Sequence, residues 1–372
     1  MKILITGAKG FVGKNLIAEL KNQGFTDILE CDTDTTSDEL DLFVRDCQFV
    51  FHLAGVNRPE NTEDYMKGNF GFTSELLNLL KKHNNKSPLL LSSSIQAALD
   101  NPYGKSKKAG ENLIFEYGEK NNTPVFVYRL PNVFGKWCRP NYNSAVATFC
   151  HNIAHDLPIQ VNDPNVFMKL VYIDDVVLSF IDKLKNGSKN ISDKRQFETV
   201  NPVHEIKLGE IADLIYSFKE SRNSLFLPNF RDEFTKKLYS TYLSYLPKDQ
   251  FNYFLKMNTD ARGSFTEFLK SVDCGQVSIN ISKPGIVKGQ HWHHTKNEKF
   301  LVVSGNGVIR FRKIDSDEVI EYFVSGEKLE VLDIPVGYTH NIENLGNSDM
   351  VTVMWANEVF DKEKPDTYWQ EV

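Results

Sequence analysis

Three glycines near the start of the chain constrain its fold more than any other feature. The apolar segment 2–6 predicts a short strand, glycines follow at positions 7, 10 and 13, and apolar residues at helical spacing come next. Between a strand and a helix, such glycines permit a tight turn, let backbone N–H groups approach a pyrophosphate and allow close packing. The spacing alone also fits an ordinary turn, but its place in the first βα unit favours a cofactor site. The residues expected around that cofactor are Gly7, Gly10, Phe11, Val12 and Gly13.

The rest of the N-terminal half alternates between apolar strands and amphipathic helices. Strands are predicted over residues 28–32, 49–53, 89–91 and 125–128. Helices are predicted over residues 14–23, 73–82 and 106–119. This alternation predicts an α/β Rossmann-like fold, in which a doubly wound parallel sheet is covered by helices on both faces.

A different pattern begins near residue 250. Short strands are predicted there over residues 275–282, 299–303, 307–312, 319–324, 328–334 and 350–355. Strands at this spacing predict a small antiparallel barrel or sandwich. A helical segment over residues 206–246 precedes it, and Pro247 is the expected boundary. The predicted domains are therefore 1–246 and 247–372.

The composition limits the classes of protein to which the chain can belong. The net charge of -6 argues against a nucleic-acid-binding protein, because no basic excess is present to displace phosphate counterions. No run of about 18 apolar residues is present, so membrane insertion is not expected, and neither is a signal peptide. The five cysteines lack paired spacing and are expected to be reduced thiols. A cytoplasmic enzyme is therefore expected.

A tyrosine and a lysine four positions apart give the strongest catalytic signal in this half. Tyr103 and Lys107 share one face of a predicted helix, which follows a serine run that ends at Ser94. The ammonium of Lys107 is expected to lower the pKa of the Tyr103 phenol. The phenol could then exchange a proton with a carbonyl oxygen, held by a serine hydroxyl, while hydride moves to or from a nicotinamide. The alternative is a solvated helix face.

Three histidines and one glutamate in the C-terminal half give a second signal. His291 and His293 are expected on one strand with their side chains on the same face, Glu298 follows a turn, and His340 comes from a later strand. Together they can converge on one divalent metal ion. Imidazole and carboxylate ligands suit Zn, Fe, Mn, Ni or Cu, and the sequence does not choose among them; zinc is the first expectation. The alternative is a set of ordinary polar side chains.

Residues 1–246 resemble the extended short-chain dehydrogenase/reductase family, which includes nucleotide-sugar epimerases, dehydratases and reductases. The motifs that carry the resemblance lie at residues 6–13, 52–55, 103–107, 129–135 and 171–176. The resemblance implies Tyr103 as proton donor, Lys107 as its modulator and ribose ligand, and Ser94 as hydroxyl partner, with Ser93 left open. It also implies Ala54 beside the cofactor and Asn132 near the nucleotide-sugar.

The coenzyme and the substrate loop are less well determined. Ser94 and Tyr103 are only nine positions apart, which is short for the family and implies a trimmed substrate loop. Asp32 at a strand end suits the ribose diol of NAD and would repel a 2′-phosphate. Lys9 or Arg58 could instead bind a phosphate, as NADPH requires.

The segment 285–344 resembles a cupin, with Leu329 where a turn glycine is expected. A reductase-like domain joined to a metal cupin barrel resembles the family of bifunctional capsular-polysaccharide synthesis enzymes. This resemblance implies a UDP-amino-sugar substrate, a UDP-4-keto-6-deoxy-HexNAc, which the cupin inverts at C3 and the reductase domain reduces at C4 with NADPH. The product lies on the route to UDP-N-acetyl-L-fucosamine, and a homodimer is implied.

Other functions remain open at this point. The N-terminal domain could be an epimerase or dehydratase that retains NAD, and the cupin could serve only as a sugar-binding or dimerisation module. The acid and base of a C3 reaction are also open, with Tyr338, Lys299 and His294 as candidates.

Overall fold

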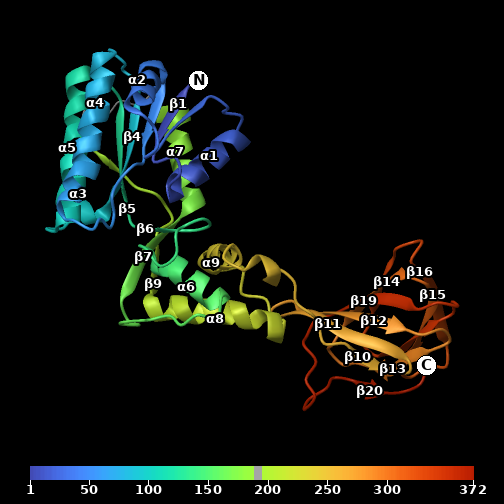
Figure 1. Cartoon of the computed structure of the whole chain (residues 1–372). Coiled ribbons are helices and arrows are strands. Elements are labelled where there is room, and N and C mark those ends of the chain that lie inside the picture. The colour runs from blue at the N-terminus through green and yellow to red at the C-terminus, as the bar shows by residue number, and fades with distance from the viewer. Residues whose placement is uncertain (188–194) are drawn as a thin grey trace. The chain divides into compact units, whose positions relative to one another are not determined.

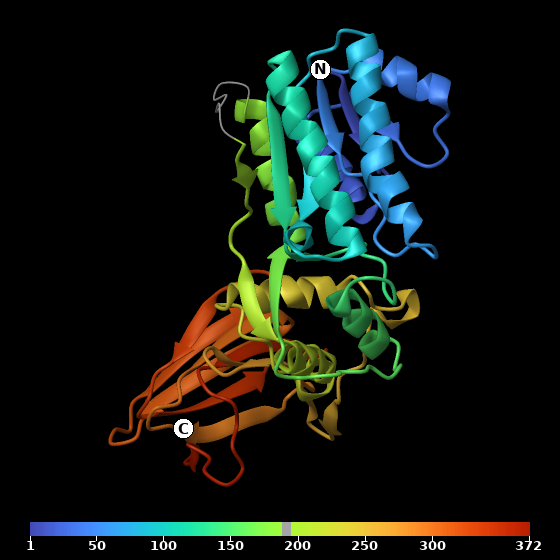
Figure 2. The same ribbon diagram turned by 90° about the vertical axis from the view of Figure 1, so that its left-hand side faces the viewer.

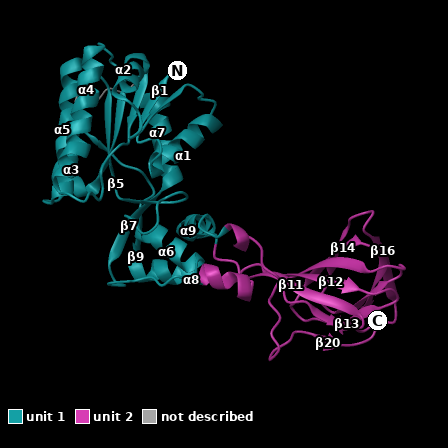
Figure 3. Cartoon of the chain, in the orientation of Figure 1, with its two compact units in different colours: residues 1–216, 230–247 teal, residues 217–229, 248–372 magenta. Residues whose placement is uncertain are grey.

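The computed structural model describes residues 1–187 and 195–372. These residues form two compact units (Figure 3). Unit 1 comprises residues 1–216 and 230–247, and unit 2 comprises residues 217–229 and 248–372. Within the described part of the chain, every helix is too short or too polar to cross a bilayer.

Unit 1 is built on a six-stranded parallel sheet with the strand order β2-β1-β3-β4-β5-β8 (Figure 1). Its strands are β1 (Ile3–Thr6), β2 (Ile28–Cys31), β3 (Phe49–His52), β4 (Leu89–Ser94), β5 (Val125–Leu130) and β8 (Phe197–Glu198). All residues of β1 and β3 are buried. Parallel strands that are covered on both faces consist of such apolar runs.

Helices cover both faces of this sheet (Figures 1 and 2). They are α1 (Phe11–Asn22), α2 (Ser37–Asp46), α3 (Glu63–Tyr65), α4 (Phe72–Lys82), α5 (Pro102–Asn121) and α7 (Ile173–Asn186), with shorter turns η1 (Met66–Gly71) and η2 (Ile95–Ala98). Successive strand residues face opposite sides. Ile3 and Ile5 therefore share a core with α1 and α7, whereas Leu4 shares one with α2, α4 and α5. The predicted doubly wound sheet is confirmed.

A smaller sheet completes unit 1. It has the strand order β6-β7-β9, formed by β6 (Asn132–Phe134), β7 (Phe167–Tyr172) and β9 (His204–Lys207). The remaining helices are α6 (Ala145–Ala154), α8 (Leu208–Ser224) and α9 (Glu233–Leu243), and α8 passes into unit 2 at Ser217. The helical segment predicted over 206–246 therefore consists of two helices.

Unit 2 is formed mainly by two antiparallel sheets, which confirms the predicted all-β domain. The first has the order β10-β11-β12-β19-β14-β17 and the second has the order β16-β15-β18-β13-β20. The strands of the first are β10 (Asn258–Asp260), β11 (Gly263–Ser271), β12 (Gly275–Ser282), β14 (Glu298–Ser304), β17 (Val331–Ile334) and β19 (Met350–Ala356). Those of the second are β13 (Val287–Trp292), β15 (Asn306–Lys313), β16 (Val319–Ser325), β18 (Tyr338–Asn344) and β20 (Tyr368–Trp369). A short turn, η4 (Lys248–Gln250), precedes them.

Strand β12 buries polar side chains rather than apolar ones. Gln276, Ser278 and Asn280 are buried, whereas the apolar residues between them are only half-buried. Side chains paired across antiparallel strands project to the same face. Gln276 pairs with Ala356 of β19, which pairs on its other side with Glu298 of β14. A buried polar row therefore leads to a predicted metal ligand.

Strand β11 was not predicted, because a bulge between Glu267 and Leu269 interrupts its two-residue period. Phe265 is separated by three positions from Phe268, which Leu269 follows directly. The regular alternation that identifies a strand from sequence is therefore missing.

Candidate active sites

The glycine loop of unit 1 joins β1 to α1 through close backbone packing. Gly7 has a φ of +72°, and a Cβ on it would lie 2.8 Å from the backbone nitrogen of Ala54. A Cβ on Gly13 would lie 2.3 Å from the carbonyl oxygen of Gly7, so neither position has room for a side chain. Gly10 is the N-cap of α1 and provides no side-chain cap. Backbone N–H groups at this helix end therefore remain for an anion such as a pyrophosphate.

Asp32 follows β2 and is tied to the glycine loop. Its Oδ2 accepts a hydrogen bond from the backbone N–H of Lys9 at 2.7 Å. The ammonium of Lys9 pairs with Asp34 at 2.5 Å. A carboxylate and an ammonium therefore both lie at the end of β2, where a dinucleotide ribose binds in this type of fold. The other phosphate-binding candidate, Arg58, is exposed in the loop after β3.

The N-terminal turn of α5 places the predicted catalytic tyrosine beside a serine at the end of β4. The Asn101 side chain caps the helix by accepting a hydrogen bond from the Gly104 N–H at 2.7 Å. This cap fixes the helix start next to Tyr103, which is half-buried. The Ser94 side chain lies close enough to the Tyr103 phenol to act on its pKa, and both residues line the same cavity. The structure therefore brings together the two groups expected on one substrate oxygen.

The neighbouring serines of β4 have other partners. Ser93 Oγ donates to Glu111 Oε1 at 2.6 Å, and Glu111, which is 1% exposed, also pairs with Arg129 at 2.7 Å. Lys107 Nζ donates to the carbonyl oxygen of Ser92 at 3.2 Å. Because strand residues alternate in direction, Ser94 faces Tyr103 while Ser93 faces the Glu111–Arg129 pair. The geometry thus favours Ser94 over Ser93 as the hydroxyl partner.

Burial determines the protonation of both predicted groups. It raises the pKa of Tyr103, while the nearby Ser94 side chain acts in the opposite direction. The expected lowering of the Tyr103 pKa by Lys107 is therefore wrong for this arrangement, in which the lysine bonds a backbone carbonyl. Burial also lowers the pKa of Lys107 to about 8, and the nearby Glu111 carboxylate limits this shift.

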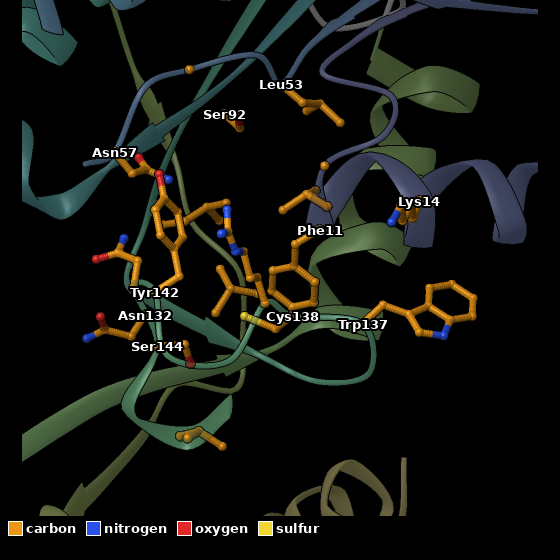
Figure 4. A pocket seen from close by; sticks show the side chains of 18 of the residues that line it. Phe11, Lys14, Leu53, Asn57, Ser92, Asn132, Trp137, Cys138, Tyr142 and Ser144 are labelled. Atoms are coloured by element: carbon orange, nitrogen blue, oxygen red, sulfur yellow. The ribbon is translucent and has the colours of Figure 1, made fainter. Parts of the chain in front are cut away.

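A cavity of 1490 Å³ connects these groups with the glycine loop (Figure 4). Gly10, Phe11, Val12, Ser94, Tyr103, Lys107 and Asn132 are among the residues that line it. Figure 4 shows Phe11, Asn132 and Tyr142 around it. Gly7, Gly13 and Ala54 are not among the lining residues; they pack closely within the loop and against it. Arg139 and Tyr142 also line the cavity, with the guanidinium 4.9 Å from the ring centre, and were missed from the sequence. Their segment follows the Asn132 motif directly, which was the available signal.

In unit 2 the four predicted metal ligands form one cluster. The ligand atoms of His291, His293, Glu298 and His340 all lie within 4.8 Å of one another. His291 pairs with His340 across β13 and β18, and Glu298 is the first residue of β14. The Nε2 atoms of His293 and His340 lie 3.5 and 3.4 Å from Glu298 Oε2. Three segments of chain therefore deliver four ligands to one point.

A bulge in β13 turns the first histidine toward this point. The register with β18 shifts between Gly289 and His291, and Gln290 between them has a φ of 65°. A Cβ on Gly289 would lie 2.8 Å from the carbonyl oxygen of His340, so glycine permits the close approach. The expectation that His291 and His293 share a strand is wrong, because β13 ends at Trp292. The two rings converge nonetheless, with their centres 4.9 Å apart.

The polar atoms of the cluster fit a divalent metal ion. His293 Nε2, His340 Nε2 and Glu298 Oε2 are buried and have no hydrogen-bond partner in the described ranges. Burial, together with His340, lowers the pKa of His291 to about 4, which keeps that imidazole neutral. Burial alone would raise the pKa of Glu298, but the nearby imidazoles and Lys296 lower it overall. Neutral imidazole and ionised carboxylate are the forms that bind a metal.

Asp366 holds the turn between two of these ligands. Its carboxylate accepts hydrogen bonds from the backbone N–H groups of His294, Thr295 and Lys296 at 2.9, 2.7 and 2.8 Å. Its backbone carbonyl bonds His293 Nδ1, which directs the Nε2 of that ring into the cluster. No local pattern indicates this contact, because 73 positions separate His293 and Asp366.

A cavity of 320 Å³, the barrel cavity, opens beside the cluster. The polar residues that line it include Glu267, Gln276, Ser278, His291, Lys296 and Glu298. The acid–base candidates from the sequence are placed elsewhere. Lys299 is exposed and paired with Asp333, and His294 is exposed and packs against Tyr368. Tyr338 is half-buried beside the apolar core of unit 2.

Comparison with known proteins gives a family for each half of the chain. Residues 3–192 match the NAD dependent epimerase/dehydratase family. Residues 258–368 match the polysaccharide biosynthesis C-terminal domain. The whole chain is similar to UDP-2-acetamido-2,6-beta-L-arabino-hexul-4-ose reductase of Pseudomonas aeruginosa. The two are 47% identical over 368 residues, which is 99% of this chain and 98% of the relative.

Solved structures extend this likeness. The crystal structure of the capsular polysaccharide assembling protein CapF from Staphylococcus aureus has 56% sequence identity and a TM-score of 0.93, and the match covers 100% of both chains. The UDP-glucuronic acid 4-epimerase of Bacillus cereus has 20% identity and a TM-score of 0.53, covering 59% of this chain and 83% of that chain. At that identity the second match shows the fold alone.

Proposed function

Since the chain belongs to the NAD dependent epimerase/dehydratase family and, over its whole length, to the family of the Pseudomonas reductase and CapF, we propose that it is a bifunctional enzyme of capsular-polysaccharide precursor synthesis. Its substrate is a UDP-4-keto-6-deoxy-HexNAc. Unit 2 exchanges and inverts C3, and unit 1 then reduces the C4 ketone. The product lies on the route to UDP-N-acetyl-L-fucosamine.

The reductase half of this proposal rests on one observation: Ser94 and Tyr103 line the same cavity as the glycine loop. NADPH bound at the glycine loop would supply the hydride. Ser94 holds the C4 oxygen of the substrate, and the Tyr103 phenol donates the proton that turns this oxygen into a hydroxyl. The raised pKa of Tyr103 keeps the phenol protonated before the reaction. Arg139 in the same cavity supplies a cation for the substrate diphosphate.

NADPH is the coenzyme of this proposal, although NAD is the alternative that Asp32 favours. Lys9 lines the cavity, and its ammonium, which pairs with Asp34, has further N–H groups for a 2′-phosphate, while the Asp32 carboxylate is engaged by the Lys9 backbone. Initial rates with NADPH and with NADH at equal concentration decide between them. A higher kcat/KM with NADH would overturn this choice and leave the reductase proposal in place.

The unpartnered cluster of His291, His293, Glu298 and His340 carries the epimerase half. A divalent ion held by these residues, with zinc as our choice, would act as a Lewis acid that makes a proton next to a ketone more acidic. The barrel cavity beside the cluster offers space for the sugar ring. We assign the exchange of the C3 proton to this cavity.

Deuterium exchange tests the division of labour. The protein is incubated in D2O with the keto-sugar nucleotide and without NADPH, and the sugar is followed by NMR. We expect deuterium at C3 with the wild type, and its loss in His340→Ala together with loss of bound metal. Tyr245→Phe, which removes the hydroxyl that bonds the Cys138 carbonyl in unit 1, is the matched control. Absence of C3 exchange in the wild type, with NADPH still oxidised, would mean that the protein is only a reductase, whose barrel serves for binding or dimerisation.

A retained coenzyme would favour the alternative function. If purified protein carried bound NAD and consumed no NADPH on the ketone, unit 1 would be an NAD-retaining epimerase or dehydratase.

A homodimer is also part of our proposal. Tyr322 and Phe323 of β16 are 49% and 68% exposed, which offers apolar surface to a second copy. Light scattering measures the mass of the particle, and a monomer would remove this part of the proposal.

A further inference from the structure

A buried lysine lies in the barrel cavity next to the metal-ligand cluster. Lys296 is 9% exposed and lines the cavity together with His291 and Glu298. Its Nζ lies 3.4 Å from Glu298 Oε1 and 5.9 Å from the ring centre of Phe360. Lysine side chains are rarely this buried unless their charge is paired. The position therefore requires an explanation beyond solvation.

A hydrogen bond to Asp366 fixes the backbone of Lys296 beside the cavity. Its N–H donates to Asp366 Oδ2 at 2.8 Å, and the same carboxylate holds the two preceding residues of the turn. A fixed backbone lets the long side chain reach the cavity without a mobile loop. This kind of support is what a functional group needs for a reproducible position.

The charge of Lys296 is not matched by a dedicated carboxylate. Glu298 is its one ion-pair partner among the residues that the structure describes, and Glu298 is also a proposed metal ligand. Two other carboxylates line the cavity: Glu267 pairs with Lys270 at 2.9 Å, and Glu358 forms no ion pair with Lys296. Lys296 is also the one lysine or arginine among the described residues that line the cavity. A bound substrate therefore meets a single ammonium group there.

We propose that Lys296 is a catalytic residue of unit 2, and that its ammonium group hydrogen-bonds the ketone oxygen of the keto-sugar. This inference rests on the proposed C3 exchange in the barrel cavity. When the C3–H bond breaks, the proton passes to solvent and the electron pair is delocalised onto the ketone oxygen. A solvent proton then returns to C3 on the other face. Lys296 keeps its three protons throughout and stabilises the charge on oxygen.

Two substitutions and a control test this role. Lys296→Gln removes the charge but keeps a donor, Lys296→Arg keeps the charge, and Lys283→Gln removes an exposed lysine of unit 2 that pairs with Asp349. Each is incubated with the keto-sugar nucleotide in D2O without NADPH, and deuterium at C3 is followed by NMR. We expect Lys296→Gln to lose about 100-fold in exchange rate, Lys296→Arg to retain more, and Lys283→Gln to match the wild type. Bound Zn²⁺ and NADPH affinity are measured on the same samples and are expected to be unchanged.

Three results would overturn this assignment. Exchange at the wild-type rate in Lys296→Gln would show that the ammonium does not act on the substrate. Recovery of Lys296→Gln exchange on addition of excess Zn²⁺ would show that Lys296 acts by holding the metal site. Absence of exchange in the wild type would instead remove the proposed epimerase function itself, so the two failures are distinguishable.

Discussion

The two sites differ in whether their polar atoms have partners within the protein. In unit 1, the Ser93 hydroxyl bonds Glu111, and Lys107 bonds the carbonyl of Ser92. In unit 2, buried atoms of His293 and His340 have no partner in the described part of the chain. Buried polar groups are nearly always satisfied. The first site is therefore assembled by the fold, whereas the second is, in our proposal, completed by an ion.

This difference explains how each site is supported. Unit 1 orients its groups by one helix cap and by the alternation of one strand, which are local features. Unit 2 brings its ligands together from β13, β14 and β18 and fixes them through a residue that follows all of them. Substitutions should therefore separate the two activities, and the size of each effect should depend on whether a reacting group or a support is removed.

The largest effect is expected from Tyr103→Phe. The substitution removes the proton donor, and reduction of the C4 ketone should fall by about 10²–10⁴-fold, the usual contribution of general acid catalysis. NADPH oxidation measures this loss. Deuterium exchange at C3 should remain, because its groups lie in unit 2. Loss of both activities in this variant would contradict two separate sites.

Ser94→Ala should have the next largest effect. It removes one donor to the substrate oxygen, and about 100-fold in kcat is expected to be lost. Ser93→Ala is the matched variant, because it removes a hydrogen bond to Glu111 instead. It should cost about 1 kcal/mol of stability and much less of the reduction rate. If Ser93→Ala were the more damaging to kcat, the assignment of Ser94 as hydroxyl partner would be wrong.

Loss of a residue that supports the ligands of unit 2 should weaken metal binding even though every ligand is still present. Asp366→Asn weakens the bonds to the turn that follows His293, and metal affinity should fall by about 10–100-fold, as for other groups that orient ligands. Competition with a metal indicator measures the affinity for Zn²⁺. Asp361→Asn, whose carboxylate accepts from Glu363 N–H, is the control. Equal affinity of Asp366→Asn and wild type would show that the turn holds its position without this carboxylate.

The smallest effect is a pH dependence confined to unit 1. The pKa of Lys107 is lowered to about 8, so its ammonium is present below that pH and is lost as the pH rises above it. We expect this ammonium to bind the coenzyme ribose, the role that the family resemblance implies, so reduction should decline above this pH by about tenfold for each further unit. Lys107→Arg keeps its charge at high pH and should remove the decline. A decline that persists in Lys107→Arg would assign it to another group.

Local patterns were sufficient to predict most of unit 1. The glycine spacing, the apolar strands and the distance between Tyr103 and Lys107 depend on turn chemistry and helix periodicity, which act over a few residues. The direction of Ser93 and Ser94 could not be decided in the same way, because it depends on where β4 stops and on what α5 places opposite. The Tyr103 pKa was misjudged because burial, a property of the whole fold, outweighs the spacing.

In unit 2 the ligands could be predicted but their support could not. His291, His293 and Glu298 form a recognisable local motif, and His340 follows a proline–glycine turn. The bulge at Gln290 depends on the register between β13 and β18, which sequence does not state. Lys296 lies two positions before Glu298 in the same segment. Its burial could not be predicted, because it depends on the strands that enclose the barrel cavity.

The position of Asp366 in the chain has a consequence for biosynthesis. All four ligands have been translated once residue 340 is made, but the group that fixes their turn is added later. A growing chain that ends between these positions carries every ligand and still lacks the support, so tight binding of the proposed metal is expected only after Asp366 has been added. Chains truncated in this interval should be recovered poor in metal, and proteolytic removal of the segment should weaken metal binding by finished protein.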